Sequence, residues 1–136
     1  MELSASMSIA ASGMSAQAQR IKVIAQNIAN ADSTAVQPGE DPYRRQMVSF
    51  KNVFDREMGA NVLKVGGIVQ DKSEFRTRFD PSHPAADASG YIKLPNVSTV
   101  LETADLREAQ RSYEASLAAM DLVKAMVAQT INSIRA

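Results

Sequence analysis

Apolar residues recur at alternating intervals of four and three along the first thirty-one residues. This spacing is typical of a coiled-coil seam, which is narrower than the apolar stripe of an ordinary surface helix. It predicts a helix from about Ser4 to about Asn30, and Gln17 is its one polar seam position. The seam consists of Leu3, Met7, Ala10, Met14, Gln17, Ile21, Ile24, Ile28 and Ala31.

A second seam of the same kind closes the chain. Thr99 and Glu102 have the spacing of a capping box, which satisfies free backbone donors at a helix start, and they predict a helix from about Val100 to about Ile134. The seam consists of Leu106, Ala109, Tyr113, Leu117, Met120, Val123, Val127, Ile131 and Ile134.

Two seams at opposite ends of one chain pair most simply with each other. We therefore predict a mainly α fold, in which long N- and C-terminal helices form an antiparallel coiled coil that carries a small β-rich or irregular middle insertion. The expected boundaries are residues 1–36 for the first helical part, 37–97 for the loop and insertion, and 98–136 for the second helical part.

The opposite faces of both helices are small and uncharged, where a surface helix usually carries Lys and Glu. Ser8, Ser15, Ala118 and Ala125 are examples. This composition predicts burial against other protein molecules, although Ala is also simply a good helix former. Gly13 is open to two interpretations, a tolerated defect or a close helix contact.

The middle of the chain holds half of the charged residues and a different pattern. Residues 43–50 are a possible strand, and residues 61–70 are a strand or a hairpin that turns at Gly66-Gly67. Strict alternation around Phe75, Thr77 and Phe79 predicts the clearest strand. The segment Asp80–Pro84 predicts a rigid turn, because its two prolines fix the backbone and remove donors.

Composition excludes several classes of protein. Fifteen basic and fifteen acidic residues cancel, which argues against a nucleic-acid or membrane-surface footprint. Cysteine is absent, so disulfides and thiolate metal sites are excluded. The sequence shows no signal-peptide pattern and no membrane span, which predicts a cytoplasmic chain unless it leaves by a route without a cleaved signal.

Candidate chemistry is sparse. Asp80, His83 and Asp87 are a weak metal-ligand set, and His83 is better interpreted as exposed or packed in its turn. The acidic residues at helical spacing near the C-terminal seam are expected to form exposed ion pairs rather than acid/base pairs. They are Glu102, Asp105, Glu108 and Glu114, with Arg107 and Arg111 as partners. No catalytic, metal or cofactor motif is recognised, so we predict no enzyme and no cofactor.

The segment from Asn27 to Ser33 gives a resemblance. An N-terminal heptad helix that ends in Asn-Ile-Ala-Asn-Ala-Asp-Ser resembles the axial proteins of the bacterial flagellum, whose common pattern has Thr where this chain has Ser33. With that change, the chain is similar to the flagellar basal-body rod protein C family of proximal-rod subunits. Further matching segments are Pro42–Arg44, Asp80–Pro84, Ala86-Asp87, Gly90–Val97 and Arg111–Ala115.

The resemblance covers essentially the whole chain and is weakest over residues 48–73. It implies a structural subunit of the proximal rod, which assembles through its terminal helices into a helical tube and transmits torque from motor to hook. It also implies localisation in the periplasm-spanning rod, and flagellar type III export without a cleaved signal. The implied partners are copies of itself, other rod proteins, the membrane-ring and export-gate adaptor, and the distal rod, with no nucleic acid and no membrane insertion.

Two sets of residues are expected to matter for this function. The assembly seams are represented by Leu3, Met7, Met14, Ile21, Ile24, Ile28, Leu106, Tyr113, Leu117, Met120, Val127, Ile131 and Ile134. The family-motif residues are Ala29, Asn30, Ser33, Tyr91, Pro95 and Asn96.

Three rival interpretations stay open at this point. The chain could be a soluble helical adaptor or chaperone-like protein, a small metal-dependent enzyme built on His83, or another rod subunit of the same axial family. The first predicts a stable monomer or dimer with a polar outer face, and the second predicts bound metal after purification.

Overall fold

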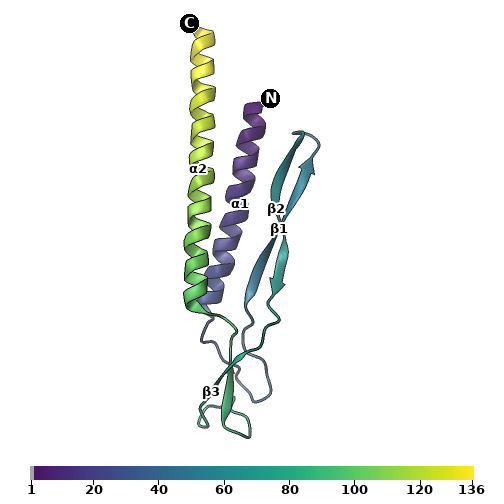
Figure 1. Ribbon diagram of the computed structural model, residues 1–136, viewed down its shortest axis with the longest axis vertical. Helices are drawn as coiled ribbons and strands as arrows, with labels where there is room; N and C mark the ends of the chain where they lie inside the picture. Colours follow the sequence, from purple (N-terminus) through teal and green to yellow (C-terminus); the bar gives the residue numbers. More distant parts are fainter. Residues whose placement is uncertain (1) are drawn as a thin grey trace. The chain divides into compact units, whose positions relative to one another are not determined.

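The computed structural model describes residues 2–136, which form two helices and four strands (Figure 1). The helices are α1 (Glu2–Ala29) and α2 (Thr99–Arg135). The strands are β1 (Gln46–Asp55), β2 (Ala60–Gln70), β3 (Arg76–Phe79) and β4 (Tyr91–Leu94). β1 pairs with β2, and β3 pairs with β4, in two separate two-stranded sheets. Both predicted helices are therefore confirmed to within two residues at each end.

The chain divides into two compact units, each of which combines residues from both helices and from the strands between them. Unit 1 contains the residues up to Ile21 together with Val48–Gly67 and Arg107–Ala136. Unit 2 contains Lys22–Met47 and Ile68–Leu106.

In unit 1, the first part of α1 lies between α2 and the β1–β2 hairpin (Figure 1). A Cβ built on Gly13 would lie 3.2 Å from Ser116 Oγ, so the glycine allows a close approach of the two helices. On another side of α1, residues 12–19 and β2 residues 63–65 line a groove of about 390 Å³. Ala16, which lines this groove, is 2% exposed.

The predicted antiparallel coiled coil with a small insertion is wrong. The middle of the chain builds two sheets, and its first hairpin has strands of 10 and 11 residues. A helix that packs on one partner buries a single narrow seam, whereas the first part of α1 has neighbours on two sides. Accordingly Ala16, which is off the seam, is buried, while the seam residues Met14 and Ile21 are only half-buried.

Unit 2 is built around the short antiparallel pair β3–β4, in which Arg76 lies opposite Leu94 and Phe79 opposite Tyr91. Alternation places two side chains of β4, those of Ile92 and Leu94, in the core. The other apolar core residues of this unit are Val23, Ile24, Ala31 and Val97.

The strand around Phe75–Phe79 is confirmed by β3, although its bounds begin at Arg76. Of the two alternatives for residues 61–70, the strand is confirmed by β2, and the hairpin with a turn at Gly66-Gly67 is wrong, because both glycines lie inside that continuous strand. The chain turns instead at residues 56–59, where Gly59 has a φ of 63° that favours glycine. Gly66 allows a close approach of the Ser49 side chain on β1, since a Cβ at Gly66 would lie 3.0 Å from Ser49 Oγ.

Within the described residues, neither helix combines the length and the apolarity that a membrane span requires.

Candidate functional site

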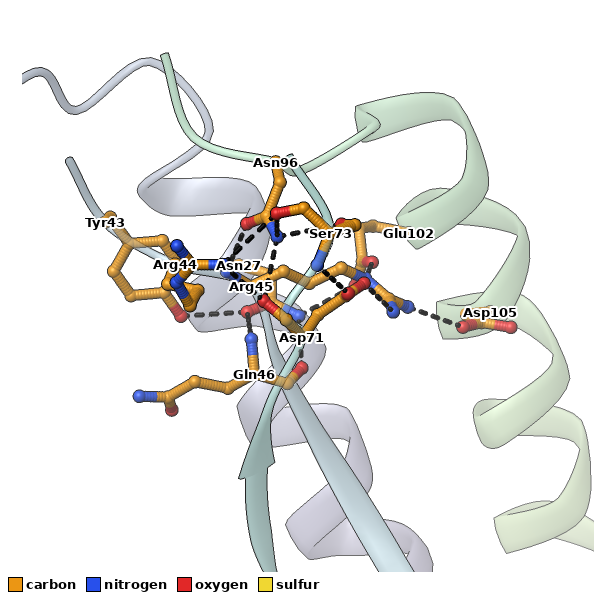
Figure 2. Close-up of polar contacts among 10 residues, drawn as sticks. All are labelled: Asn27, Tyr43, Arg44, Arg45, Gln46, Asp71, Ser73, Asn96, Glu102 and Asp105. Carbon is orange, nitrogen blue, oxygen red and sulfur yellow. Dashed lines mark hydrogen bonds and ion pairs between the residues drawn. The ribbon is translucent and has the colours of Figure 1, made fainter. Parts of the chain in front are cut away.

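Unit 2 contains a polar cluster that joins segments far apart in the sequence (Figure 2). Its members come from the end of α1, the residues around the start of β1, the residues that follow β2, the residues after β4, and the first turns of α2. We call these ten residues the polar junction: Asn27, Tyr43, Arg44, Arg45, Gln46, Asp71, Ser73, Asn96, Glu102 and Asp105.

The side chain of Asn27 makes the two backbone hydrogen bonds that a neighbouring strand would make with β1. Its side chain donates through Nδ2 to the backbone oxygen of Gln46 at 2.8 Å, and its Oδ1 accepts from the backbone nitrogen of Gln46 at 3.0 Å. Oδ1 also accepts from the Tyr43 hydroxyl at 2.8 Å, and Nδ2 donates to Glu102 Oε2 at 3.0 Å. The amide is 1% exposed and makes four hydrogen bonds, so its burial carries no penalty for lost hydration.

Asn96 fixes the same region from the other side. Its Oδ1 accepts from the backbone nitrogen of Arg45 at 2.8 Å. Its Nδ2 lies 3.0 Å from the backbone oxygen of Asp71, 3.0 Å from Ser73 Oγ and 3.3 Å from the backbone oxygen of Ser73. Two asparagines thus hold the backbone at the start of β1 and the segment after β2.

Arg45 is the charged centre of the junction. Its Nε donates to Glu102 Oε1, while its terminal nitrogens lie 3.4 Å from Asp71 Oδ2 and 3.7 Å from Asp105 Oδ2. The Glu102 side chain is 1% exposed and the Arg45 side chain is 22% exposed, so a buried carboxylate is held by a partly buried guanidinium. Burial alone would lower the pKa of Arg45, but the hydrogen bonds and charges of Glu102 and Asp71 outweigh it and raise that pKa.

Two further groups of the junction have displaced pKa values. Burial, followed by the negative charge of Glu102, raises the pKa of Tyr43, so its hydroxyl stays protonated and can donate to Asn27. Hydrogen bonds from the backbone and the side chain of Ser73, followed by the contact with Arg45, lower the pKa of Asp71. All these charges and hydrogen bonds are satisfied by the chain itself.

The structure corrects one prediction in this region. Glu102 was expected to cap α2 and to form an exposed ion pair, but its carboxylate is buried and is held by Arg45 and Asn27. Glu108 does form an ion pair, with Arg20 at 3.6 Å in unit 1.

The junction supports a structural role better than a catalytic one, because its carboxylates are held by Arg45, by Asn27 and by the backbone and hydroxyl of Ser73. His83 packs in its turn: its Nε2 lies 3.1 Å from Thr34 Oγ1, and its Nδ1 accepts from the backbone nitrogen of Ala85 at 3.0 Å. Among residues 2–136, no three His, Asp or Glu side chains gather where they could hold a metal ion.

The family-motif residues have separate local roles. Asn30 Nδ2 donates to the backbone oxygen of Gln26 at 2.8 Å, and Ser33 Oγ donates to Asn30 Oδ1 at 3.2 Å, so both residues close the end of α1. Pro95 is fully buried, and its carbonyl accepts from Arg76 Nε at 3.1 Å. Tyr91 packs edge-on against Phe79 with ring centroids 5.2 Å apart, and Ala29 is exposed.

The predicted seam residues differ in exposure within this single chain. Ile24 is 5% exposed, whereas Leu117, Ile131 and Ile134 are 39%, 45% and 79% exposed. The remaining seam residues are half-buried: Leu3, Met7, Met14, Ile21, Ile28, Leu106, Tyr113, Met120 and Val127.

Sequence reasoning missed most of the junction, including Asn27, Arg45 and Asp71. A signal for Asn27 was present, because it lies between Ile24 and Ile28 on a helix and a polar residue among core positions must find partners. Nothing in the sequence shows that those partners lie about twenty and seventy-five residues away.

The second half of α2 has a face that the described residues 2–136 leave largely exposed. Leu122 and Met126 are 63% and 49% exposed. At about 100° per residue they lie close around the helix to Ala115, Ala119 and Ser133, all exposed and uncharged. The two charged residues between 115 and 134 are Asp121 and Lys124, which project from another side.

Comparison with known protein families matches both ends of the chain. Residues 7–35 match the family described as "Flagella basal body rod protein". Residues 88–134 match the family described as "Flagellar basal body rod FlgEFG protein C-terminal".

Curated relatives match almost the whole chain. The flagellar basal-body rod protein FlgC of Agrobacterium fabrum is 43% identical over 134 residues, covering 98% of this chain and 96% of that protein. The FlgC proteins of Bacillus subtilis and Salmonella typhimurium are 37% and 36% identical, and they cover 93% and 90% of this chain and 94% and 91% of their own lengths.

Proposed function

Because this chain belongs to the flagellar basal-body rod protein family and is a structural subunit of the bacterial flagellar rod, not an enzyme, we propose a route by which it is built into that rod. The terminal helices form the contacts between subunits. Residues 37–97 lie outside the helical core of the tube and select unlike neighbours. The assembled subunit transmits torque from motor to hook.

The uncharged face of α2 carries this proposal. Large apolar side chains such as Leu122 and Met126 are unfavourable in water and gain roughly 1.5–3 kcal/mol each when fully buried. The small residues beside them, such as Ala119, let another backbone come close. A soluble adaptor or chaperone is not favoured, because family models match both helical ends and the relatives span nearly the whole chain.

Membership of the flagellar rod family also suggests which proteins the subunit contacts. We infer that the subunit contacts copies of itself and other rod proteins, the membrane-ring and export-gate adaptor below, and the distal rod above. We also infer that it travels through the flagellar type III export route without a cleaved signal. The seam residues that remain exposed, Leu117, Ile131 and Ile134, are proposed to be covered by these neighbours.

The first prediction tests the α2 face in cells that lack their own copy of the protein. Leu122→Asp places a charge on the proposed interface but in a position that is 63% exposed in the free chain. We expect loss of swimming and of assembled rods with an unchanged melting temperature of the purified chain, because the cost falls on association alone. Swimming halos and isolated basal bodies measure the effect.

The matched control is Ala128→Asp, which adds the same charge at an exposed position on the charged side of the helix. We expect this variant to swim. Equal motility of the two variants would contradict the proposed interface. Ile24 is unsuitable as an interface probe, because it is buried inside unit 2 and a charge there would report on folding.

A further inference from the structure

We propose that Asn27, Arg45, Asp71 and Glu102 form a charge latch, a conformational device that lets unit 2 close only when its separate segments come together. The latch concerns how the chain reaches its ordered form, so it goes beyond the function in the rod and does not depend on it. Its four residues come from α1, the start of β1, the segment after β2, and α2.

The geometry makes Glu102 the critical member. Its carboxylate is 1% exposed; one oxygen is bound by Arg45 Nε and the other by Asn27 Nδ2 at 3.0 Å. Arg45 in turn contacts Asp71, while Asn27 is bound to the backbone of Gln46 at two points. Removing any one segment therefore leaves a buried polar group of another segment without its partner (Figure 2).

The physical basis is an asymmetry between removing one charge and removing both. A buried pair replaced by neutral groups of similar shape is often tolerated, because both desolvation costs disappear. A buried charge that loses its partner keeps its desolvation cost, and stability falls by about 100-fold or more in the folding equilibrium. Partly closed forms, with Glu102 buried but Arg45 absent, are disfavoured on the same grounds.

Arg45 stands between Glu102, Asp71 and Asp105, and the Tyr43 hydroxyl approaches from the segment before β1. In the native chain, the lowered pKa of Asp71 means that the contribution of this carboxylate to stability is constant near neutral pH and falls only as the pH drops below the ordinary aspartate range of about 4.

The latch is tested by urea unfolding of the full chain, followed by far-UV circular dichroism, and by hydrogen exchange over residues 22–47 and 68–106. We expect Arg45→Met to shift the unfolding equilibrium by about 100-fold or more at pH 7. The double variant Arg45→Met/Glu102→Gln is expected to recover at least about tenfold of that loss, because it leaves no unpaired buried charge.

The matched control is Arg44→Met. Arg44 bonds to the backbone oxygens of Asp71 and Ser73 and lies 4.2 Å from the ring centroid of Phe75, so its loss weakens the same region without exposing a buried carboxylate. Its deficit should not be recovered when Glu102→Gln is added. The latch is overturned if the double variant Arg45→Met/Glu102→Gln is no more stable than Arg45→Met.

Discussion

At the scale of the residue, two asparagines replace what a third strand would provide. Asn27 presents a donor and an acceptor to the backbone of Gln46, and Asn96 does so for Arg45 and the residues near Asp71. A strand start is normally satisfied by neighbouring backbone. Here a side chain from a helix and another from a loop supply the same groups, a role that suits an amide because it carries both a donor and an acceptor.

The serine at the end of α1 has a testable role. Ser33 Oγ donates to Asn30 Oδ1, and its hydroxyl is the group that Thr would also offer. We expect Ser33→Thr to change the free energy of unfolding by less than about 0.5 kcal/mol and Ser33→Ala to reduce it by about 1 kcal/mol. Thermal melts of the two variants measure this, and equal melting temperatures would contradict the role of the hydroxyl.

Gln17 is the polar member of the first seam and remains imperfectly satisfied. Its Oε1 is buried and finds no hydrogen-bond partner among the residues that the structure describes. An unsatisfied buried acceptor costs about 1–3 kcal/mol, so Gln17→Leu is expected to stabilise the chain by about that amount. Gln19→Leu, at an exposed position of the same helix, is the control and should have little effect. A loss of stability in Gln17→Leu would show that the amide has a partner.

At the scale of the element, α1 is a helix with two neighbours in unit 1, and its sequence reflects both. The side toward α2 carries Gly13, and the side toward the hairpin carries Ala16, each small enough for close packing. The small residues interpreted as an outer face therefore serve, in part, contacts within the chain. The groove beside Ala16 includes Ser15, one of the residues predicted to face other molecules.

Gly13 gives a prediction about helix packing. Gly13→Ala gains about 1 kcal/mol in helix propensity, but its Cβ would meet Ser116 Oγ at 3.2 Å. The double variant Gly13→Ala/Ser116→Ala removes that oxygen and is expected to be about 1 kcal/mol more stable than Ser116→Ala alone. Thermal melts of the double variant and of Ser116→Ala measure this difference. A double variant less stable than Ser116→Ala would show that the backbones of α1 and α2 are too close for a Cβ at position 13.

At the scale of the whole molecule, the sequence predicted what periodicity can encode. Both helices and the alternating strand at Phe79 follow from local patterns. The long hairpin was misplaced because two glycines inside a strand resemble a turn, and Gly59 was the weaker local signal. The prediction of a coiled coil was wrong because an apolar seam indicates that a helix is buried, but does not indicate how many elements bury it.

The polar junction was beyond the reach of sequence pattern for a related reason. Asn27 and Glu102 are 75 residues apart, and Arg45 and Glu102 are 57 apart. Ion pairs between residues so far apart give no periodic pattern in the sequence, whereas pairs spaced three or four residues apart on a helix can be predicted from it. The family resemblance was recognisable for the opposite reason, since it rests on contiguous segments such as Asn27–Ser33 and Gly90–Val97.

On our proposal that the α2 face around Leu122 and Met126 joins one subunit to the next, rod assembly should depend on temperature. Apolar association is driven by the entropy of water near 25 °C and weakens on cooling. Because this face lacks charges that could replace it, the attachment of one subunit to the next should loosen in the cold while the ion-paired interior of unit 2 stays closed. Rods would then shorten at their growing end before any subunit unfolds.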